Sequence, residues 1–392
     1  MFELSGRAND LIERIRALQP DLSECAPFSE KLRRSTDAQV DMLGDTGVYG
    51  MLVPESHGGL ELDVDAFVEV GLALGEADIS MAWVTNFYIE HNFLLCLAEE
   101  PFQNSVYSDG ESWVLAAAVN APTGASVPVE GGYRVTGRWK WGTGIAHSSW
   151  VLVNTLIADE SPGAPTARMV WIPKDEVHVE DTWHVSGMVG TGSHDIVVED
   201  VFVPVDRTMS MEEILAGAGP GAKLHAAPLY KTPMVPVLML AAALPIVGHA
   251  GRVARDFNER LKVHVPMAAT GSRTDDPAAQ MRLAQAQFEA DQAALTLRAI
   301  AADVMAIREN ATPLDRTRWA CSITLAVHQA RRTILDVSEA SGASAQNLSH
   351  PLQRAVRDVN AATTHVAFNR DNQRQSYAKH LLGKKDIGFG LF

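Results

Sequence analysis

Gly131-Gly-Tyr-Arg-Val-Thr-Gly-Arg-Trp-Lys-Trp-Gly-Thr-Gly-Ile-Ala-His147 is the stretch around which the rest of the chain is organised. Its pattern predicts a strand, a tight glycine turn and a second strand that continues into Ser148-Ser-Trp-Val-Leu-Val153. Because strand side chains alternate between two faces, an extended segment would place Trp139, Trp141 and Thr143 together, opposite the glycines. Such a face suits a planar ring that stacks and hydrogen-bonds, and the alternative is a buried hairpin with core tryptophans.

The composition argues against several classes of function. The chain has 392 residues, of which 46% are hydrophobic and 21% charged, as in ordinary globular proteins of two or three packed units. Its formal charge is −15 and it has no basic run, so nucleic acid is not an expected partner. The most apolar run, Met234 to Gly248, contains two prolines and is too short to span a bilayer, so we expect no membrane association.

The cysteines and the N-terminus indicate a cytoplasmic protein. The three cysteines lie far apart and form no CxxC pair, which predicts neither a disulfide framework nor a metal site and fits a reducing compartment. The first residues lack the basic and then apolar pattern of a signal peptide.

The predicted secondary structure changes twice along the chain. Residues 1–111 have helical spacing, residues 112–222 form short β-rich segments separated by turns, and residues 223–392 contain long alanine-rich helical segments. The expected long helices are Pro236–Leu261, Ala278–Asn310, Leu314–Ser341 and Pro351–Leu382. The predicted fold is therefore α+β and multidomain, with an N-terminal helical domain, a middle antiparallel β domain and a C-terminal four-helix bundle.

Four motifs, in order, resemble those of the acyl-CoA dehydrogenase fold, and the resemblance extends from about residue 45 to the end. They are Ala118-Val-Asn-Ala-Pro122, Gly137-Arg-Trp-Lys-Trp-Gly-Thr-Gly144, Gly187-Met-Val-Gly-Thr-Gly-Ser193 and Pro351-Leu-Gln-Arg-Ala-Val-Arg-Asp358. In that family the first motif is a flavin-contacting loop, and the resemblance of the second implies that Trp141 and Thr143 border the isoalloxazine ring. The resemblance therefore implies flavin contacts at Asn120, Trp141, Thr143, Trp183, Ser193 and Arg260, with Arg260 holding the flavin phosphate across a subunit boundary.

One departure from the superfamily pattern decides the expected activity. A typical acyl-CoA dehydrogenase has a Tyr-Glu-Gly-Thr loop after its Arg-Asp, and the Glu is its base. Here Asp358 is followed by Val-Asn-Ala-Ala-Thr-Thr-His365, without that glutamate. The pattern is similar to that of the two-component flavin-dependent monooxygenases built on this fold. The resemblance implies that reduced FAD or FMN arrives from a separate flavin reductase, reacts with O2 to give a C4a-hydroperoxide, and hydroxylates an electron-rich aromatic such as a phenol or indole.

The resemblance also implies roles for individual residues. His365 would be the general base, because an intrinsic pKa of about 6.5 suits proton abstraction near neutral pH. His91 would face it and orient the substrate or donate to the peroxide, while Thr143 would hydrogen-bond the flavin adduct. Trp83 and Trp139 would wall a dry pocket. Each histidine and Trp83 has a structural alternative as a packed core residue, and Arg357-Asp358 is expected to be an internal ion pair that positions its helix.

Two other functions remain open at this stage. An acyl-CoA dehydrogenase or flavin oxidase with a relocated base would need a glutamate facing the flavin from Pro236–Leu261, where only Asp256 and Glu259 are acidic. A non-catalytic protein of this fold would not bind flavin. The long apolar helices and the resemblance favour a homotetramer. No dinucleotide-binding pattern is visible, so NAD(P)H alone should not reduce the flavin. Neither FMN nor FAD is preferred by the residues themselves.

Overall fold

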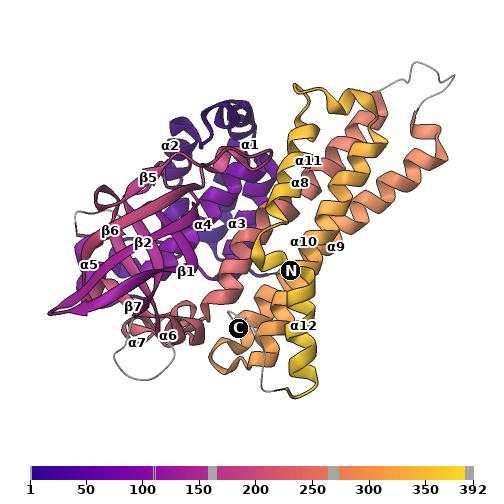
Figure 1. The fold of residues 1–392 in the computed structure, drawn as a ribbon. Coiled ribbons are helices and arrows are strands. Elements are labelled where there is room, and N and C mark those ends of the chain that lie inside the picture. Colours follow the sequence, from indigo (N-terminus) through magenta and orange to yellow (C-terminus); the bar gives the residue numbers. More distant parts are fainter. Residues whose placement is uncertain (1, 109, 111, 158–165, 264–272, 385–392) are drawn as a thin grey trace.

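The computed structural model describes residues 2–108, 110, 112–157, 166–263 and 273–384, and its helical and β regions follow the predicted order (Figure 1). The predicted boundary after residue 111 lies outside the described residues. The first region contains α1 (Gly6–Leu32), α2 (Asp37–Asp45), η1 (Val48–Gly50), η2 (Glu55–His57), α3 (Val64–Ala77), α4 (Ile79–Leu95) and α5 (Glu100–Val106). Of these helices, α3 and α4 lie between the strands and the C-terminal bundle in Figure 1.

Helix α4 is the buried centre of the molecule. Asp78 caps its N-terminus by accepting a hydrogen bond from the backbone N–H of Met81, which satisfies a donor that the helix itself cannot pair. Every residue of α4 is buried, because α3 and α8 cover one side and β1 and α11 reach another. A helix without an exposed face is a core element, so its few polar side chains need partners inside the protein.

The middle region forms one sheet of seven strands in the order β5-β6-β2-β1-β3-β4-β7. The strands are β1 (Ala116–Val129), β2 (Gly132–Gly142), β3 (Trp150–Ile157), β4 (Thr166–Pro173), β5 (His178–Glu180), β6 (His194–Pro204) and β7 (Thr208–Ser210). Short 3-10 turns are η3 (Lys174–Glu176), η4 (Val189–Thr191) and η5 (Val205–Arg207). The sheet is mixed, because β1 and β3 pair in parallel, so the expectation of a purely antiparallel unit is wrong. The predicted hairpin is also wrong, since β1 lies between β2 and β3.

The strand register explains why the expected shared face of two tryptophans and Thr143 does not form. The pairing of β2 with β6 shifts between Trp139 and Gly142, and Trp141 has a positive φ of 71°. Trp139 is consequently buried in the core of the β region, where its Nε1 donates to the Asn154 carbonyl at 2.7 Å. Trp141 is 65% exposed. A bulge of this kind re-aims a side chain and breaks the period-two alternation.

The C-terminal region begins with short elements and then forms the bundle. The elements are α6 (Met211–Ala216), α7 (Pro220–Leu224), η6 (Pro228–Lys231), α8 (Met234–Val263), η7 (Arg273–Asp275), α9 (Pro277–Ile307), η8 (Arg308–Asn310), α10 (Pro313–Ala340), η9 (Ala343–Gln346), α11 (Pro351–Ala362), η10 (Val366–Phe368) and α12 (Arg370–Leu381). Helices α8, α9 and α10 confirm three predicted segments. Helix α8 is long and apolar enough to cross a membrane, but 89% of its most apolar window is buried within the protein.

The fourth predicted helix is interrupted. Helix α11 ends at Ala362, and α12 begins only at Arg370, where the side chain of Asn369 caps it by accepting two backbone N–H bonds. His365 stands in this interruption rather than on a helix, and its side chain caps η10. Because the side chains of His365 and Asn369 each cap a new helical element, the chain breaks here instead of continuing as one helix. The break turns His365 toward α4.

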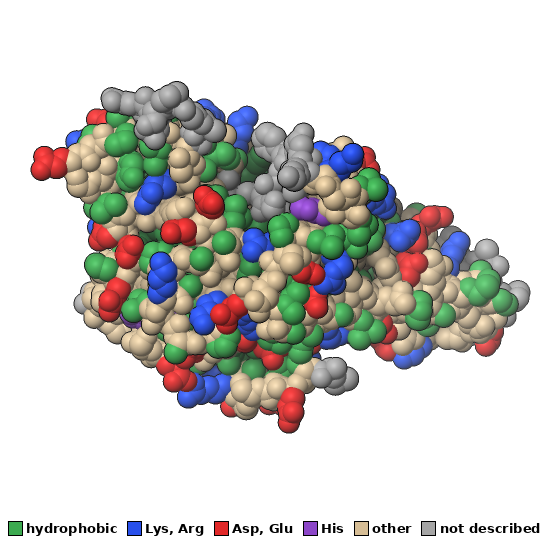
Figure 2. All heavy atoms as spheres, turned by 90° about the horizontal axis from the view of Figure 1, so that it is seen from below, with side chains coloured by type: hydrophobic (Ala, Val, Ile, Leu, Met, Phe, Trp, Pro, Cys, Tyr) green, Lys and Arg blue, Asp and Glu red, His purple; other side chains and the backbone are tan. Residues whose placement is uncertain are grey.

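The surface carries no concentrated charge of one sign on the face that Figure 2 presents. Acidic and basic side chains are intermixed there among polar and apolar ones. Many pair locally, as in the contacts of Arg34 with Asp37 and of Arg252 with Asp256. Such a face lacks the basic stripe that a nucleic-acid interface requires.

Candidate active site

A row of aromatic rings connects the two histidines that the sequence analysis selected. The ring centroids of His365 and Trp83 are 5.6 Å apart, those of Trp83 and Phe87 5.2 Å, and those of Phe87 and His91 5.6 Å. The first two contacts are edge-to-face. Trp83, Phe87 and His91 follow each other at intervals of four on α4, which places them on one face of the helix. The structure thus brings His365 to the wall formed by α4.

The imidazole of His91 is held in one tautomer by the backbone. Its Nδ1 contacts the carbonyl oxygen of Ala116, and a carbonyl only accepts, so Nδ1 carries the proton. In the neutral ring, Nε2 is therefore the atom with the free lone pair. Burial lowers the pKa of His91 to about 4, which keeps the ring neutral, although the Ala116 hydrogen bond works in the opposite direction.

His365 is held in the opposite tautomer. Its Nδ1 accepts a hydrogen bond of 3.3 Å from the backbone N–H of Ala367, so the neutral ring carries its proton on Nε2. Burial lowers the pKa of His365 to about 4, well below the intrinsic value that suited it to a base near neutral pH. In this state His365 offers a hydrogen-bond donor. It can accept a proton only by giving up its contact with Ala367.

Three hydroxyl groups form a chain at the edge of the β region. Thr143 Oγ1 lies 3.0 Å from Ser193 Oγ, which lies 2.8 Å from Thr191 Oγ1. The Thr191 hydroxyl donates to the Met188 carbonyl at 2.9 Å, so the 2.8 Å contact requires Ser193 to donate to Thr191. By the same reasoning Thr143 donates to Ser193. The remaining lone pairs of Thr143 are then available as acceptors.

Two tryptophans flank this chain of hydroxyls in sequence and differ in exposure. Trp141 immediately precedes the turn that carries Thr143 and exposes most of its ring. Trp183 is partly buried and its Nε1 donates to the Met188 carbonyl at 3.0 Å. An exposed indole next to a hydroxyl acceptor fits a planar ring system with an N–H group, such as a reduced flavin. The side chain of Asn120, on β1, is not among those that the structure describes.

The glycines of the central stretch serve the protein rather than an approaching ring. A side chain at Gly144, where φ is +74°, would meet the Tyr88 ring at 2.6 Å, and one at Gly142 would meet Ile196 at 2.5 Å. Tyr88, on α4, donates to the Gly144 carbonyl. This hydrogen bond ties the turn that carries Thr143 to the helix that carries His91. The two halves of the site are therefore joined through Tyr88.

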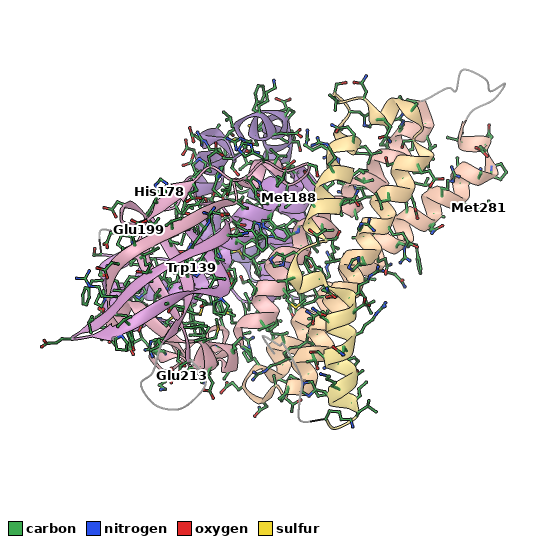
Figure 3. The ribbon with its side chains drawn as sticks, viewed as in Figure 1. Trp139, His178, Met188, Glu199, Glu213 and Met281 are labelled. Atoms are coloured by element: carbon green, nitrogen blue, oxygen red, sulfur yellow. The ribbon has the colours of Figure 1, made fainter. Side chains whose placement is uncertain are left out.

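Two predicted site residues lie apart from this arrangement. Trp139 is enclosed by the β core, where side chains at Gly124 and Gly137 would collide with it, so it does not wall a substrate pocket (Figure 3). Arg260 lies near the end of α8, where its guanidinium contacts His350 at 2.7 Å and donates to Ser344 at 2.6 Å. No described contact joins Arg260 to the other predicted flavin ligands. A role for it across a subunit boundary stays a prediction.

Arg357 and Asp358 have separate partners and do not form the expected ion pair with each other. Arg357 pairs with Glu30 of α1. Asp358 accepts a hydrogen bond of 2.6 Å from the backbone N–H of Met188, at the border between the β region and α11 (Figure 3). The two residues still position their helix, because each ties α11 to another element.

Glu90 and Thr191 were not predicted as site residues from the sequence. Glu90 is fully buried on α4 next to His91, and Thr191 fixes the direction of the hydroxyl chain. A signal for Glu90 was present in the sequence, since an acidic residue interrupts the apolar run of α4 without an exposed face to occupy. No comparable signal existed for Thr191, whose role depends on which carbonyl its hydroxyl reaches.

Comparisons with known proteins identify the family and the fold. The family model "Acyl-CoA dehydrogenase, C-terminal domain" matches residues 240–370. The chain is 34% identical to the "flavin-dependent monooxygenase, oxygenase subunit HsaA" of Rhodococcus jostii, over 97% of this chain and 98% of the relative. The crystal structure of 3-HSA hydroxylase from Rhodococcus sp. RHA1 superimposes with a TM-score of 0.90 at 30% identity, covering 97% of this chain and 98% of that one.

A second solved structure has a flavin bound. XiaF from Streptomyces sp., in complex with FADH2 and glycerol, has a TM-score of 0.88 and 27% identity, covering 98% of this chain and 97% of XiaF. The fold is thus that of the acyl-CoA dehydrogenase superfamily. Within it, the chain belongs to the oxygenase components of the two-component flavin-dependent monooxygenases.

Proposed function

We propose that this protein uses reduced FAD or FMN from a separate reductase, together with O2, to hydroxylate an electron-rich aromatic compound such as a phenol or indole. Membership of the family supports the flavin, and the name oxygenase component implies a separate reductase. The proposed class of substrate is supported by the row of rings from His365 through Trp83 and Phe87 to His91. A wall of apolar rings with a polar nitrogen at each end suits a flat substrate that bears O–H or N–H groups.

The flavin would supply the oxygen chemistry, and the protein would bind, orient and keep water out. Trp141 would stack on the ring system, and Thr143 would accept from its N–H with the direction that Ser193 imposes. His365 would donate from Nε2 toward the reacting oxygen. The buried rings of Trp83 and Phe87 would exclude water from this contact.

The arrangement of acidic residues on α8 argues against an acyl-CoA dehydrogenase. Asp256 pairs with Arg252, and Glu259 pairs with Lys262, both on the exposed part of the helix. The described residues of α8 therefore direct no carboxylate toward the flavin side. The relatives identified above are monooxygenases, which leaves this alternative without support.

Variants of His365 test the proposal. His365→Ala should abolish formation of the hydroxylated product while reduced flavin is still bound and consumed. His365→Gln should restore part of the activity, because the glutamine amide can donate from a position close to Nε2. Product would be measured by chromatography with phenol, resorcinol and indole as probes. Undiminished hydroxylation by His365→Ala would remove His365 from the mechanism.

The supply of electrons gives a second test. With NADH or NADPH and no reductase, the protein should neither bleach added FAD nor form product, because no dinucleotide-binding pattern is present in the sequence. Adding an unrelated flavin reductase should start both reactions. Rapid bleaching by NADH alone would contradict the two-component proposal.

We further propose that the protein is a cytoplasmic homotetramer, as expected from the sequence. Met281, Phe288 and Leu295 recur every seven residues on α9 and are 68%, 62% and 60% exposed, which supports an interface between helices of different copies. Met281 lies at the outer end of α9 in Figure 3. Unpaired cysteines support a reducing compartment. Light scattering should give four copies for the wild type and a smaller species for Phe288→Glu.

A further inference from the structure

A carboxyl group lies within the aromatic wall of the site. Glu90 is 0% exposed. Its spacing along α4 places it on the same side as Trp83, seven residues earlier, and Phe87, three residues earlier. Trp83 faces His365 and Phe87 faces His91, so this side of α4 is the side that lines the site. Glu90 therefore lies on the side of α4 that carries the row of rings between the two histidines.

Glu90 has no hydrogen-bond partner among the described residues. Both carboxyl oxygens are buried and unpaired. Oε2 lies 3.4 Å from His91 Nε2, although the geometry of that contact is not that of a hydrogen bond. Burying a carboxyl without a partner costs several kcal/mol, so the group must hold a proton or receive a hydrogen-bond donor from a ligand.

Among the described residues, the elements that pack most extensively on α4 bring no charged side chain to Glu90. The facing part of α8, Met234 to Gly248, has no titratable side chain, and neither do η4 and the first residues of β1. The phenol of Tyr49, on η1, is neutral because burial raises its pKa. On α11, Arg354 contacts Asp78 and Asp358 contacts Ser80, about 18 Å and about 15 Å along the helix from Glu90.

The carboxylates of α3 also have other roles. Glu69 pairs with Arg298, Glu76 pairs with Arg255, and Asp65 accepts from the backbone N–H of Ala66. Burial alone therefore raises the pKa of Glu90 to about 8. Both histidines of the site have a pKa lowered to about 4. Among these groups, Glu90 has a pKa closest to neutral pH, and its deprotonated fraction is a buried carboxylate that can take a proton from a phenol.

We propose that Glu90 is the residue that takes the substrate's acidic proton, and that the substrate therefore presents a phenolic O–H or an indole N–H to α4 beside His91. This assignment rests on the function proposed above. In the step, the substrate O–H or N–H bond breaks and its electron pair stays on the substrate. An O–H bond forms on the Glu90 carboxylate, and no other group is oxidised or reduced.

His91 would act as the positioning partner of Glu90. Its Nδ1–H is fixed on the Ala116 carbonyl, so the free lone pair is on Nε2, which lies 3.4 Å from Glu90 Oε2. A small change in either side chain would let a proton on Oε2 be donated to this lone pair. The substrate becomes the electron-rich anion, which is the form that an electrophilic oxygen attacks most readily.

Infrared difference spectroscopy of the full chain without flavin tests the proton directly. The spectrum at pH 6 minus that at pH 9 should contain the carbonyl band of a protonated buried carboxyl, and Glu90→Gln should lack it. Asp65→Asn is the matched control, because burial also raises the pKa of Asp65 but the residue lies outside the site. Phenol should shift the band and its methyl ether, anisole, should not. A band that ignores phenol, or that survives in Glu90→Gln, would overturn the assignment.

Turnover then separates this proposal from the general function. With reduced FAD from an added reductase and O2, the wild type should hydroxylate at least one of phenol, resorcinol and indole. Glu90→Gln should bind reduced FAD and consume O2 normally but form product about 100-fold more slowly, since it cannot take a proton. Full product formation by Glu90→Gln would refute the role of Glu90 alone. Failure of the wild type on every probe would instead count against the proposed function.

Discussion

The backbone N–H of Met188 donates to the carboxylate of Asp358 at 2.6 Å, so a helix of the bundle holds the loop that leads to Ser193. Ser80, on α4, reaches the other oxygen of Asp358 at 3.4 Å. The Met188 carbonyl in turn accepts from Trp183 and Thr191. The backbone of Met188 therefore connects α11 with Trp183 and the chain of hydroxyls. Burial and the nearby Asp78 raise the pKa of Asp358.

Substitution of Asp358 should weaken flavin binding in a graded way. Asp358→Asn keeps an oxygen that can accept from Met188, so the dissociation constant of reduced FAD should change only a few-fold. Asp358→Leu leaves a buried N–H unpaired at a cost of about 1–3 kcal/mol, so binding should weaken by about 5-fold to at most about 150-fold. Anaerobic fluorescence titration measures both constants. Equal affinity for the leucine variant and the wild type would contradict the role of this contact.

The two tryptophans of the central stretch should behave differently. Trp139→Ala removes a fully buried indole, so the free energy of unfolding should fall by about 3–5 kcal/mol. Trp141→Ala removes an exposed ring, so stability should change by about 0.5 kcal/mol or less while reduced flavin binds more weakly. Urea unfolding and flavin titration of each variant separate the two effects. Strong flavin binding by Trp141→Ala would exclude stacking on this ring.

The hydroxyl chain should control the fate of reduced flavin. Thr143→Val loses the acceptor and should release more hydrogen peroxide per reduced flavin consumed, whereas Thr143→Ser should stay close to the wild type. Thr191→Val frees Ser193 from its fixed direction, so preference for reduced over oxidised flavin should fall, by up to about tenfold. Peroxide assays and paired affinity measurements provide the readouts. Unchanged values in both valine variants would show that the chain does not reach the flavin.

The stability of the protein should depend on Glu90 in a defined pH range. The folded pKa of Glu90 is raised from 4.5 to about 8, so the native state binds more protons than the unfolded state between these values. Stability is therefore lost as pH rises, by up to about 1.4 kcal/mol per unit. Glu90→Gln removes this loss, and its advantage in melting temperature over the wild type should grow from pH 5 to pH 8. A constant difference would mean that Glu90 is not the titrating group.

The order of the regions and most long helices followed from the sequence because they depend on local periodicity. The long segments of α8, α9 and α10 keep their helical spacing through the tertiary structure. The break before α12 did not follow, since it depends on caps at His365 and Asn369 whose partners are backbone groups. Strand pairing could also not be predicted from the sequence. Strands β2 and β3 are consecutive in the chain, but β1 lies between them in the sheet.

The candidate site was only partly predictable for similar reasons. Thr143 and Ser193 were expected to share a ligand, and the structure places their hydroxyls in contact. Trp139 was misplaced because a bulge and one positive φ reversed the parity of the strand. The tautomers of His91 and His365 could not be predicted from the sequence. The first is set by the carbonyl of Ala116, which is distant along the chain, and the second by the N–H of Ala367, whose contact depends on the local backbone conformation.

The most direct test of the central claim is an incorporation experiment with oxygen-18 gas. The protein would be supplied with reduced FAD by an added reductase and with phenol, resorcinol or indole as probe, and the product would be analysed by mass spectrometry. We expect a hydroxylated product that contains one oxygen-18 atom and that forms only when both the reductase and the protein are present. Product oxygen derived from water, or consumption of reduced flavin with hydrogen peroxide as the sole outcome for every probe, would contradict it.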